Sequence, residues 1–219
     1  MGTFADMQNR IADELGGRTD LLVPSASMTY SPIQLAIQDA VSFWENERFY
    51  FNEYRTDSAF STVVGQEFYT SSDWADIATI FHLDKLTILI SGNRYFMTPR
   101  TEQWMDDISI NPSWSGQPVN YSYYNYKLRF YPIPNGVYPV MVEGTKKFTQ
   151  LSGNSDSNVW TTDGEPLIRL TAKQYLYRDT ILDDIKSASM EAGAAKQFKS
   201  LKGGTFKKAA SLKFQPTQF

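Results

Sequence analysis

Apolar residues near the N-terminus repeat with the period of an α-helix. A first helix is predicted over residues 3–15, and its apolar positions are Phe4, Met7, Ile11 and Leu15. A second helix is predicted from Ser31 to about residue 48, because Ser31 is a favourable cap, Pro32 suits the first helical position and Gln34 completes a capping box. The apolar face of this helix consists of Ile33, Ala36, Ile37, Ala40, Val41 and Trp44.

From residue 49 to about residue 150 the pattern changes to the alternation of β-strands. Two hairpins are predicted, one with its turn at Gly65 and one with its turn at "SGN" (91–93). A short helix is predicted to begin at Thr98, with Pro99 at its first position. Two further strands are predicted around "PIPNG". In the first of them polar residues alternate with Tyr124, Tyr126, Leu128 and Phe130.

The helical period returns near the C-terminus. A long helix is predicted for residues 165–193, and its apolar stripe is Leu167, Leu170, Tyr175, Leu182 and Ile185. Beyond it, Gly203-Gly204 and Pro216 are expected to break any helix.

These elements predict an α+β protein. Helices from both ends form a helical bundle, an antiparallel β-rich region is inserted between them, and an extended C-terminal arm follows. The expected segments are N-terminal helices (1–48), a β-rich insertion (49–160), a C-terminal helix (161–192) and a basic arm (193–219).

Charge is unevenly distributed along the 219 residues. The net charge is −3, but residues 193–219 contain six lysines and no acid. The remaining 15 basic residues face 24 acids, so residues 1–192 carry −9. An acidic body with a basic end is typical of a chain whose terminus binds a partner.

Residues that could carry catalysis are sparse. The chain has no cysteine, which excludes disulfides and thiolate metal sites and fits a reducing cytoplasm. His82 is the only histidine, no Gly-x-Ser-x-Gly motif presents a serine, and no phosphate-binding glycine motif occurs. We therefore expect no catalytic residue, no metal and no cofactor. No apolar run approaches the ~18 residues of a membrane span.

The basic C-terminal segment suggests three interpretations: an arm that binds a partner or a neighbouring subunit, a single-stranded nucleic-acid-binding tail, or a soluble terminus. Its phenylalanines recur every eight residues among lysines. The candidate binding residues are Lys196, Phe198, Lys199, Lys202, Phe206, Lys207, Lys208, Lys213, Phe214 and Phe219.

The predicted hairpin around Gly65 is rich in aromatic residues. Such rings either fill the core or form contacts between subunits. The candidates for inter-subunit contact are Phe60, Phe68, Tyr69 and Trp74.

The order of segments resembles that of a known protein family. An "IADEL" helix leads to "IQLAIQDAVSFWENERFYFNE" and "STVVGQEFYTSSDW", then to "RTEQWMDDIS", "SGQPVNYSYYNYKLRFYPIPNGVY" and finally "NVWTTDGEPLIRLTAKQYLY". This succession, over most of residues 3–185, resembles the head-to-tail adaptor (connector) proteins of tailed bacteriophages, the group that includes podovirus tail accessory or adaptor factors.

The resemblance implies a structural virion protein of the phage neck or tail, assembled in the host cytoplasm. Adaptors of this kind form a homo-oligomeric ring, usually a dodecamer, under the portal protein. The ring extends the channel through which genome DNA passes without sequence-specific binding, and it offers a platform to the tail or nozzle protein. No reaction and no membrane are involved.

Two other functions are compatible with the residues alone. A nucleic-acid-binding module could act through the Lys/Phe-rich tail, with an affinity that falls steeply with salt. A carbohydrate-binding or hydrolytic virion protein could use exposed tyrosines and tryptophans, and a hydrolase would need a pair of carboxylates about 5–10 Å apart.

Overall fold

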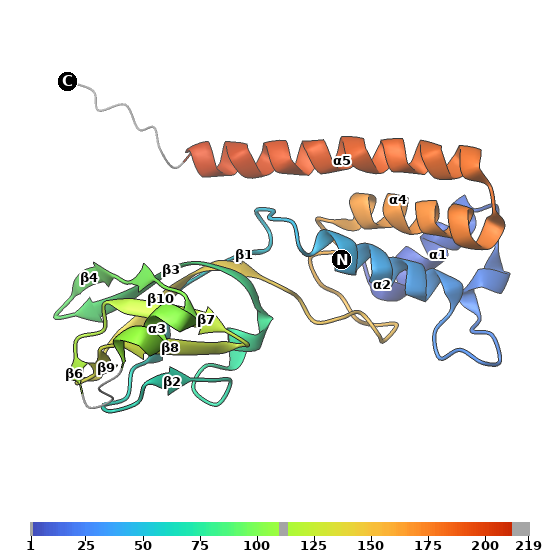
Figure 1. Ribbon diagram of the computed structural model, residues 1–219. Coiled ribbons are helices and arrows are strands. Elements are labelled where there is room, and N and C mark those ends of the chain that lie inside the picture. Colours follow the sequence, from blue (N-terminus) through green and yellow to red (C-terminus); the bar gives the residue numbers. More distant parts are fainter. Residues whose placement is uncertain (1, 110–113, 212–219) are drawn as a thin grey trace, which may run out of the picture. The chain divides into compact units, whose positions relative to one another are not determined.

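The computed structural model describes residues 2–109 and 114–211, with side chains as far as Phe206. It forms two compact units: a helical unit, Met1–Asn52 with Phe148–Phe219, and a β unit, Glu53–Lys147 (Figure 1). Both ends of the chain build one unit and the middle builds the other. The predicted α+β class, with an inserted β-rich region, is confirmed.

The first two helices of the helical unit begin where their caps predict. Thr3 and Asp6 form one capping box, and Ser31 and Gln34 form another. The helical elements of this unit are α1 (Phe4–Glu14), the 3-10 helix η1 (Thr19–Leu22), α2 (Pro32–Trp44), α4 (Glu165–Tyr175), the π-helix η3 (Leu176–Ile181) and α5 (Asp184–Ser211).

Helix α4 is the central element of the helical unit. It packs against α2 on one side and α5 on another (Figure 1). The apolar stripes predicted for the first two helices lie in this core. Its fully buried side chains include Phe4, Ile11, Ile33, Ile37, Phe49, Trp160, Leu167 and Ile168.

The prediction of one helix over residues 165–193 was wrong, because the chain reverses direction within it. After the π-helix, Leu182 adopts a left-handed conformation (φ 59°, ψ 44°). The Asp183 carboxylate then accepts a hydrogen bond from the backbone N–H of Lys186 at 3.0 Å. An aspartate in this position caps a new helix and favours its start, so α5 is separate from α4.

The prediction that Gly203-Gly204 break the last helix was also wrong. Helix α5 continues to Ser211, which gives 28 residues and a length of about 42 Å. Glycine in a helix costs about 1 kcal/mol per residue relative to alanine. Contacts just before and just after the two glycines offset this cost. Leu201 lies against the core, and the Thr205 hydroxyl accepts a hydrogen bond from the Tyr50 backbone N–H. Pro216 lies outside the described residues.

The β unit contains two four-stranded sheets and one short helix. The strand orders are β1-β10-β3-β4 and β2-β8-β7-β5, and β6 pairs with β9. The elements are β1 (Glu53–Ser61), β2 (Phe68–Tyr69), the 3-10 helix η2 (Ala75–Thr79), β3 (Ile80–Ile90), β4 (Asn93–Phe96), β5 (Thr98–Pro99), α3 (Glu102–Ile108), β6 (Ser115–Gly116), β7 (Asn120–Tyr124), β8 (Lys127–Tyr131), β9 (Ile133–Pro134) and β10 (Pro139–Lys146).

Side chains from both larger sheets form the core of the β unit. In the first sheet Val140 is paired with Ile88, and Val142 with Leu86, so alternate positions of β10 and β3 point inward. The second sheet contributes Tyr69, Tyr121, Leu128 and Phe130.

The strand pairing confirms one predicted hairpin and corrects the other. Strands β3 and β4 pair around Ser91-Gly92, both with positive φ, as predicted. The strands on either side of Gly65 do not pair with each other: β1 pairs with β10, whereas β2 pairs with β8. Strand β10 lies between β1 and β3 in the first sheet, whereas β2 is an edge strand of the second sheet.

Two further boundaries differ from the prediction. Residues 124–130 do not form one strand, since Asn125 and Tyr126 adopt positive φ and turn the chain between β7 and β8. The short helix α3 is capped by Thr101, whose hydroxyl accepts from the Trp104 N–H. Thr98 instead belongs to β5, which pairs with β7.

We predict that Phe198→Ala destabilises the helical unit and that Phe206→Ala does not. The two residues lie eight positions apart, which rotates them by about 80° on a helix. Phe198 packs against the helical core. Phe206 is rotated away from that core and is 71% exposed. Urea unfolding followed by circular dichroism should show a loss of about 2–3 kcal/mol for the first variant and less than about 0.5 kcal/mol for the second. Equal losses would contradict this helical register.

Candidate interaction surfaces

Helix α5 carries a basic face on the side that does not pack on the chain. Ala194 is buried against the helical core, and Gly193 approaches the Leu170 side chain. Lys196 and Lys199 are exposed. Residues three apart are neighbours on a helix surface, so these two ammonium groups lie on one face. We call Lys196 and Lys199 the basic face.

Two of the predicted binding residues of α5 are used within the chain. The ring of Phe198 stacks on Trp44 with centroids 4.9 Å apart and lies edge-on to Phe49 at 6.0 Å. The Lys202 ammonium forms an ion pair with Glu47 at 2.8 Å. These contacts fix α5 on the end of α2 and on the segment that follows it.

The remaining predicted residues of the C-terminal segment fall into three groups. Phe206 is exposed on α5. The backbone of Lys207 and Lys208 belongs to α5, and their side chains lie outside the described part of the chain. The residues that lie wholly outside the described range are Lys213, Phe214 and Phe219.

Three of the four aromatic residues predicted for contacts between subunits are buried in the β unit. Phe60, Tyr69 and Trp74 are at most 8% exposed, and Phe60 stacks on Trp74 with centroids 5.7 Å apart. They occupy the core, which was one of the two expected roles. Phe68 is 45% exposed, with the Arg129 guanidinium 5.1 Å from its ring centroid. It is therefore the ring of this set that a neighbouring molecule can reach.

A buried arginine organises the second sheet of the β unit. The side chain of Arg129 is 9% exposed and forms ion pairs with Glu67 at 2.6 Å, Glu102 at 3.0 Å and Asp106 at 2.5 Å. It also donates to the Ser109 hydroxyl at 2.7 Å. Burial alone would lower the pKa of Arg129, but the hydrogen bonds to Asp106 and Glu67 outweigh it and raise that pKa. The guanidinium thus joins α3 to β8 and to the segment before β2.

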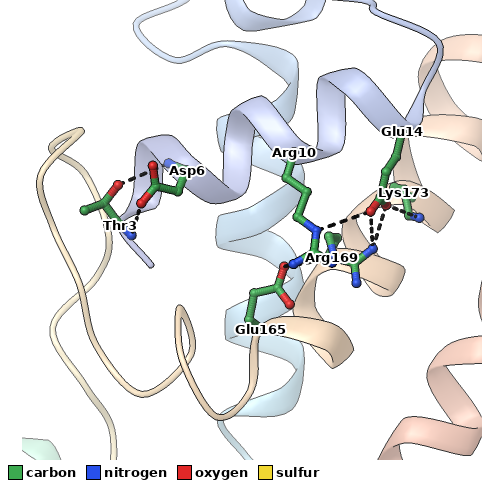
Figure 2. Close-up of polar contacts among 7 residues, drawn as sticks. All are labelled: Thr3, Asp6, Arg10, Glu14, Glu165, Arg169 and Lys173. Atoms are coloured by element: carbon green, nitrogen blue, oxygen red, sulfur yellow. Dashed lines mark hydrogen bonds and ion pairs between the residues drawn. The ribbon is translucent and has the colours of Figure 1, made fainter. Parts of the chain in front are cut away.

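A second ionic cluster joins α1 to α4 in the helical unit. Figure 2 shows the Glu14 carboxylate between Arg10, Arg169 and Lys173. Arg169 and Lys173 each donate to Glu14 at 2.6 Å, and Arg169 also donates to Glu165 at 2.9 Å. The bases on α4 are spaced four residues apart, so they line one face of that helix. We call these five residues the Glu14 cluster.

The charges of the Glu14 cluster are mutually satisfied. Burial by itself raises the pKa of Glu14, but hydrogen bonds from Lys173 and Arg169 overcome this effect, and the pKa of Glu14 lies below its ordinary value. Burial likewise lowers the pKa of Arg169, and its bonds to Glu14 reverse that effect and raise it. A carboxylate held ionised by two bases is a poor proton donor or acceptor at neutral pH, so the cluster is an anchor between helices.

Other candidate chemistry is limited to surface positions. His82 is exposed on β3, with its Nε2 3.4 Å from the Asp84 carboxylate. Across the residues described, His, Asp and Glu side chains nowhere gather in groups of three that could hold a metal ion. None of the helices in the described ranges has both the length and the apolar character needed to cross a membrane.

The sequence reasoning missed both ionic clusters, although each leaves a signal. Glu165, Arg169 and Lys173 recur every four residues, which indicates a charged helix face. Arg129 stands between Leu128 and Phe130 in a strand that is buried on both sides, where a charge requires partners. Neither signal names the partner, because the carboxylates come from distant parts of the chain.

Comparison with known proteins agrees with a role in virion structure. A protein-family model described as SU10 adaptor protein matches residues 2–211, which include both units. The chain therefore belongs to the SU10 adaptor protein family, and this membership makes it a bacteriophage structural adaptor. A search of curated proteins gave no match.

We predict that Arg129→Met destabilises the β unit by about 3–5 kcal/mol, because Glu67 and Glu102 would keep partly buried charges without their partner. Urea unfolding measures the change. The control is Arg94→Met on the exposed strand β4, for which we expect less than about 0.5 kcal/mol. A similar loss of stability in both variants would show that the ion pairs of Arg129 do not stabilise the β unit more than an exposed arginine does.

We predict that Glu14→Gln weakens the dependence of stability on acid pH. Since the pKa of Glu14 is lowered by folding, its contribution is present above the ordinary glutamate value of about 4.3 and is lost as pH falls through the lowered pKa. Allowing for solvent screening, the variant should lose about 1 kcal/mol at pH 7 and little at pH 2–3. Thermal unfolding over this pH range measures the difference.

The control for this prediction is Asp20→Asn, which removes an exposed ion pair with Arg18. We expect little change from it at pH 7, because exposed pairs are screened by water and salt. If Glu14→Gln behaved like this control, the Glu14 cluster would not anchor α1 to α4.

Proposed function

We propose that the protein is a subunit of a ring that docks under the portal of a short-tailed phage. Twelve copies, the usual number in rings of this kind, are expected. The ring extends the DNA channel and gives the tail or nozzle protein its attachment platform. Family membership supports the adaptor role. The observation that carries the docking step is the basic face of α5, because it is exposed on a helix that is itself anchored to the chain.

The charge distribution of the helical unit supports an electrostatic docking surface. Residues 1–52 and 148–192 contain 14 acids and 7 bases, whereas residues 193–219 contain six lysines and no acid. The basic end is therefore separated from an acidic body within one unit. An acidic patch on the portal would attract the basic end and repel the body, which orients the subunit as it approaches.

The anchoring of α5 makes weak charge contacts more effective. Phe198 and Lys202 hold the helix in place, so Lys196 and Lys199 lose side-chain freedom but no backbone freedom when they meet a partner. An exposed ion pair contributes only about 0–1 kcal/mol. A ring presents the same pair of lysines many times, and avidity multiplies the small contribution of each copy.

The acidic body suits a channel for DNA. Like charge keeps the duplex from adhering to the wall, so the genome can slide through the ring. In the β unit, the exposed ring of Phe68 provides area for a neighbouring subunit. Such a role requires no catalytic residue and no cofactor.

An alternative function is nucleic-acid binding through the C-terminal segment. The observation that favours it is the exposed ring of Phe206 on the same helix as the basic face. An exposed aromatic ring near lysines can stack on a base while the lysines meet phosphates. This binding would weaken steeply with salt and would also be lost when Phe206 is replaced.

We predict that the double variant Lys196→Glu with Lys199→Glu no longer binds the portal ring with a full set of copies. Deleting residues 193–219 is a poorer test, because it also removes Ala194 and Phe198 from the helical core. Reversing two exposed charges should weaken docking by roughly tenfold or more per copy, if each lost pair contributes about 0.5–1 kcal/mol and repulsion adds to it. Native mass of the chain mixed with the portal protein of the same phage measures the copies bound.

The control reverses two exposed charges on the β unit, Arg94→Glu with Lys127→Glu, and should fill the ring like the wild type. Equal filling by the α5 variant would refute docking through the basic face. If the wild-type chain bound no portal but bound single-stranded DNA tightly at low salt, with loss of binding in Phe206→Ala, the nucleic-acid alternative would replace the adaptor ring.

A further inference from the structure

Helix α5 contains two adjacent glycines that no packing contact requires. We call Gly203 and Gly204 the glycine pair. A methyl group at either position would have no atom of the described residues within 4 Å, apart from its own helical turn and chain neighbours. Neither glycine has a positive φ, so alanine fits the backbone as well. Alanine favours a helix over glycine by about fivefold per position. The pair therefore weakens α5 by a factor of roughly 25, although its side chains could be larger.

The helix is held differently before and after the glycine pair. Before it, Leu201 lies against the helical core and the Lys202 ammonium forms its ion pair with Glu47 at 2.8 Å. After it, the described side chains are those of Thr205, which is buried, and Phe206, which is 71% exposed. The first part of α5 is thus fixed on the core, whereas Thr205 alone among these two side chains holds the part that follows.

The Thr205 hydroxyl spans the glycine pair with one bond and reaches the rest of the chain with another. It donates to the Leu201 carbonyl oxygen at 2.9 Å, one turn back across the glycines. It also accepts from the Tyr50 backbone N–H at 3.1 Å, three residues before β1 begins. We call this hydroxyl with its two hydrogen bonds the latch. Because a hydrogen bond contributes little net stability in water, the latch can open and close readily.

We propose that the glycine pair is a hinge, closed by the latch in the free chain and opened when the subunit docks on the portal. Sharp bends in helices occur at glycines, and a threonine that bonds one turn back favours bending. When the hinge opens, the part of α5 up to Lys202 stays on the core. The turns that follow, with Phe206, Lys207 and Lys208, take another direction. They can then follow a partner surface that is not aligned with the anchored part of the helix.

The inference rests on the proposed docking and gives that docking a conformational step. A partner that binds only the open hinge shifts the equilibrium towards it. While the closed state predominates, the apparent affinity for that partner is reduced by the small fraction of open chains. A change that stabilises the straight helix should therefore weaken docking by the same factor.

Amide hydrogen exchange of the free, full-length chain tests the hinge without the portal. The N–H groups of residues 204–207 bond to carbonyls of residues 200–203 and so span the glycine pair. We expect a step in protection at the pair, with residues 204–207 exchanging at least about tenfold faster than residues 195–201. In the double variant Gly203→Ala with Gly204→Ala, exchange at residues 204–207 should slow by roughly 25-fold. A gradual rise of exchange towards Ser211, without a step at the pair, would indicate simple fraying and overturn the hinge.

Three single variants serve as controls for the hinge and the latch. Gly193→Ala lies in the same helix, where the new methyl group makes an ordinary contact with the Leu170 side chain, and should leave exchange at residues 204–207 unchanged. Thr205→Val removes the hydroxyl and should speed exchange there and at the Tyr50 amide by roughly fivefold. Thr205→Ser keeps the hydroxyl and should behave like the wild type. If Thr205→Val left both sites unchanged, the latch would be refuted.

Docking on the portal protein of the same phage tests the use of the hinge. The double alanine variant should dock up to roughly 25-fold more weakly than the wild type, and Gly193→Ala should dock equally well. Thr205→Val should dock at least as tightly as the wild type, because its latch is already open. If it docked more weakly, the glycines would serve close approach of a partner and the hinge would be overturned.

The same measurement separates this inference from the proposed function. If the double alanine variant docks like the wild type, opening on docking is refuted and the adaptor ring stands. If the wild type itself forms no complex with the portal, the proposed docking fails and the conformational step fails with it.

Discussion

An aromatic cluster holds the two ends of the chain together, and the rest of the helical unit depends on it. Phe49, just beyond α2, lies edge-on to Trp160 at 5.9 Å and to Phe198 at 6.0 Å, and Phe198 stacks on Trp44. Trp44 and Phe49 lie more than one hundred residues before Trp160 and Phe198 in the sequence. Large rings bury much area at low entropic cost, so a few of them can secure a long helix whose own stripe is rich in small residues.

The two ionic clusters have a different role, because they set orientation where apolar packing alone would allow several arrangements. Glu14 is placed between two bases of α4, and this fixes how α1 lies on that helix. Arg129 does the same for α3 on the second sheet. A charge removed from water must find its partners, so a misplaced helix would leave it unpaired. Packing supplies most of the stability and the clusters select one geometry.

Local signals in the sequence predicted those elements whose boundaries are set locally. The capping box of Ser31 and the turn at Ser91-Gly92 each need only neighbouring residues, and both were found where expected. Pairing between distant strands was not predictable, because β10 competes with β2 for β1 and only the assembled core decides. The same holds for α5. The sequence indicates its lysines, but it does not show that Phe198 packs inward, because that packing depends on the distant residue Trp44.

The insertion of the β unit has a consequence for the order of folding. Glu53, where the unit begins, is paired with Thr145 near its end, so the chain enters and leaves the β unit at neighbouring points. During synthesis the complete β unit therefore leaves the ribosome before α4 and α5 do. Helices α1 and α2 must wait for their core partners while the middle of the chain folds. The helical unit is assembled last, so a product truncated before α4 lacks much of the core on which α1 and α2 pack.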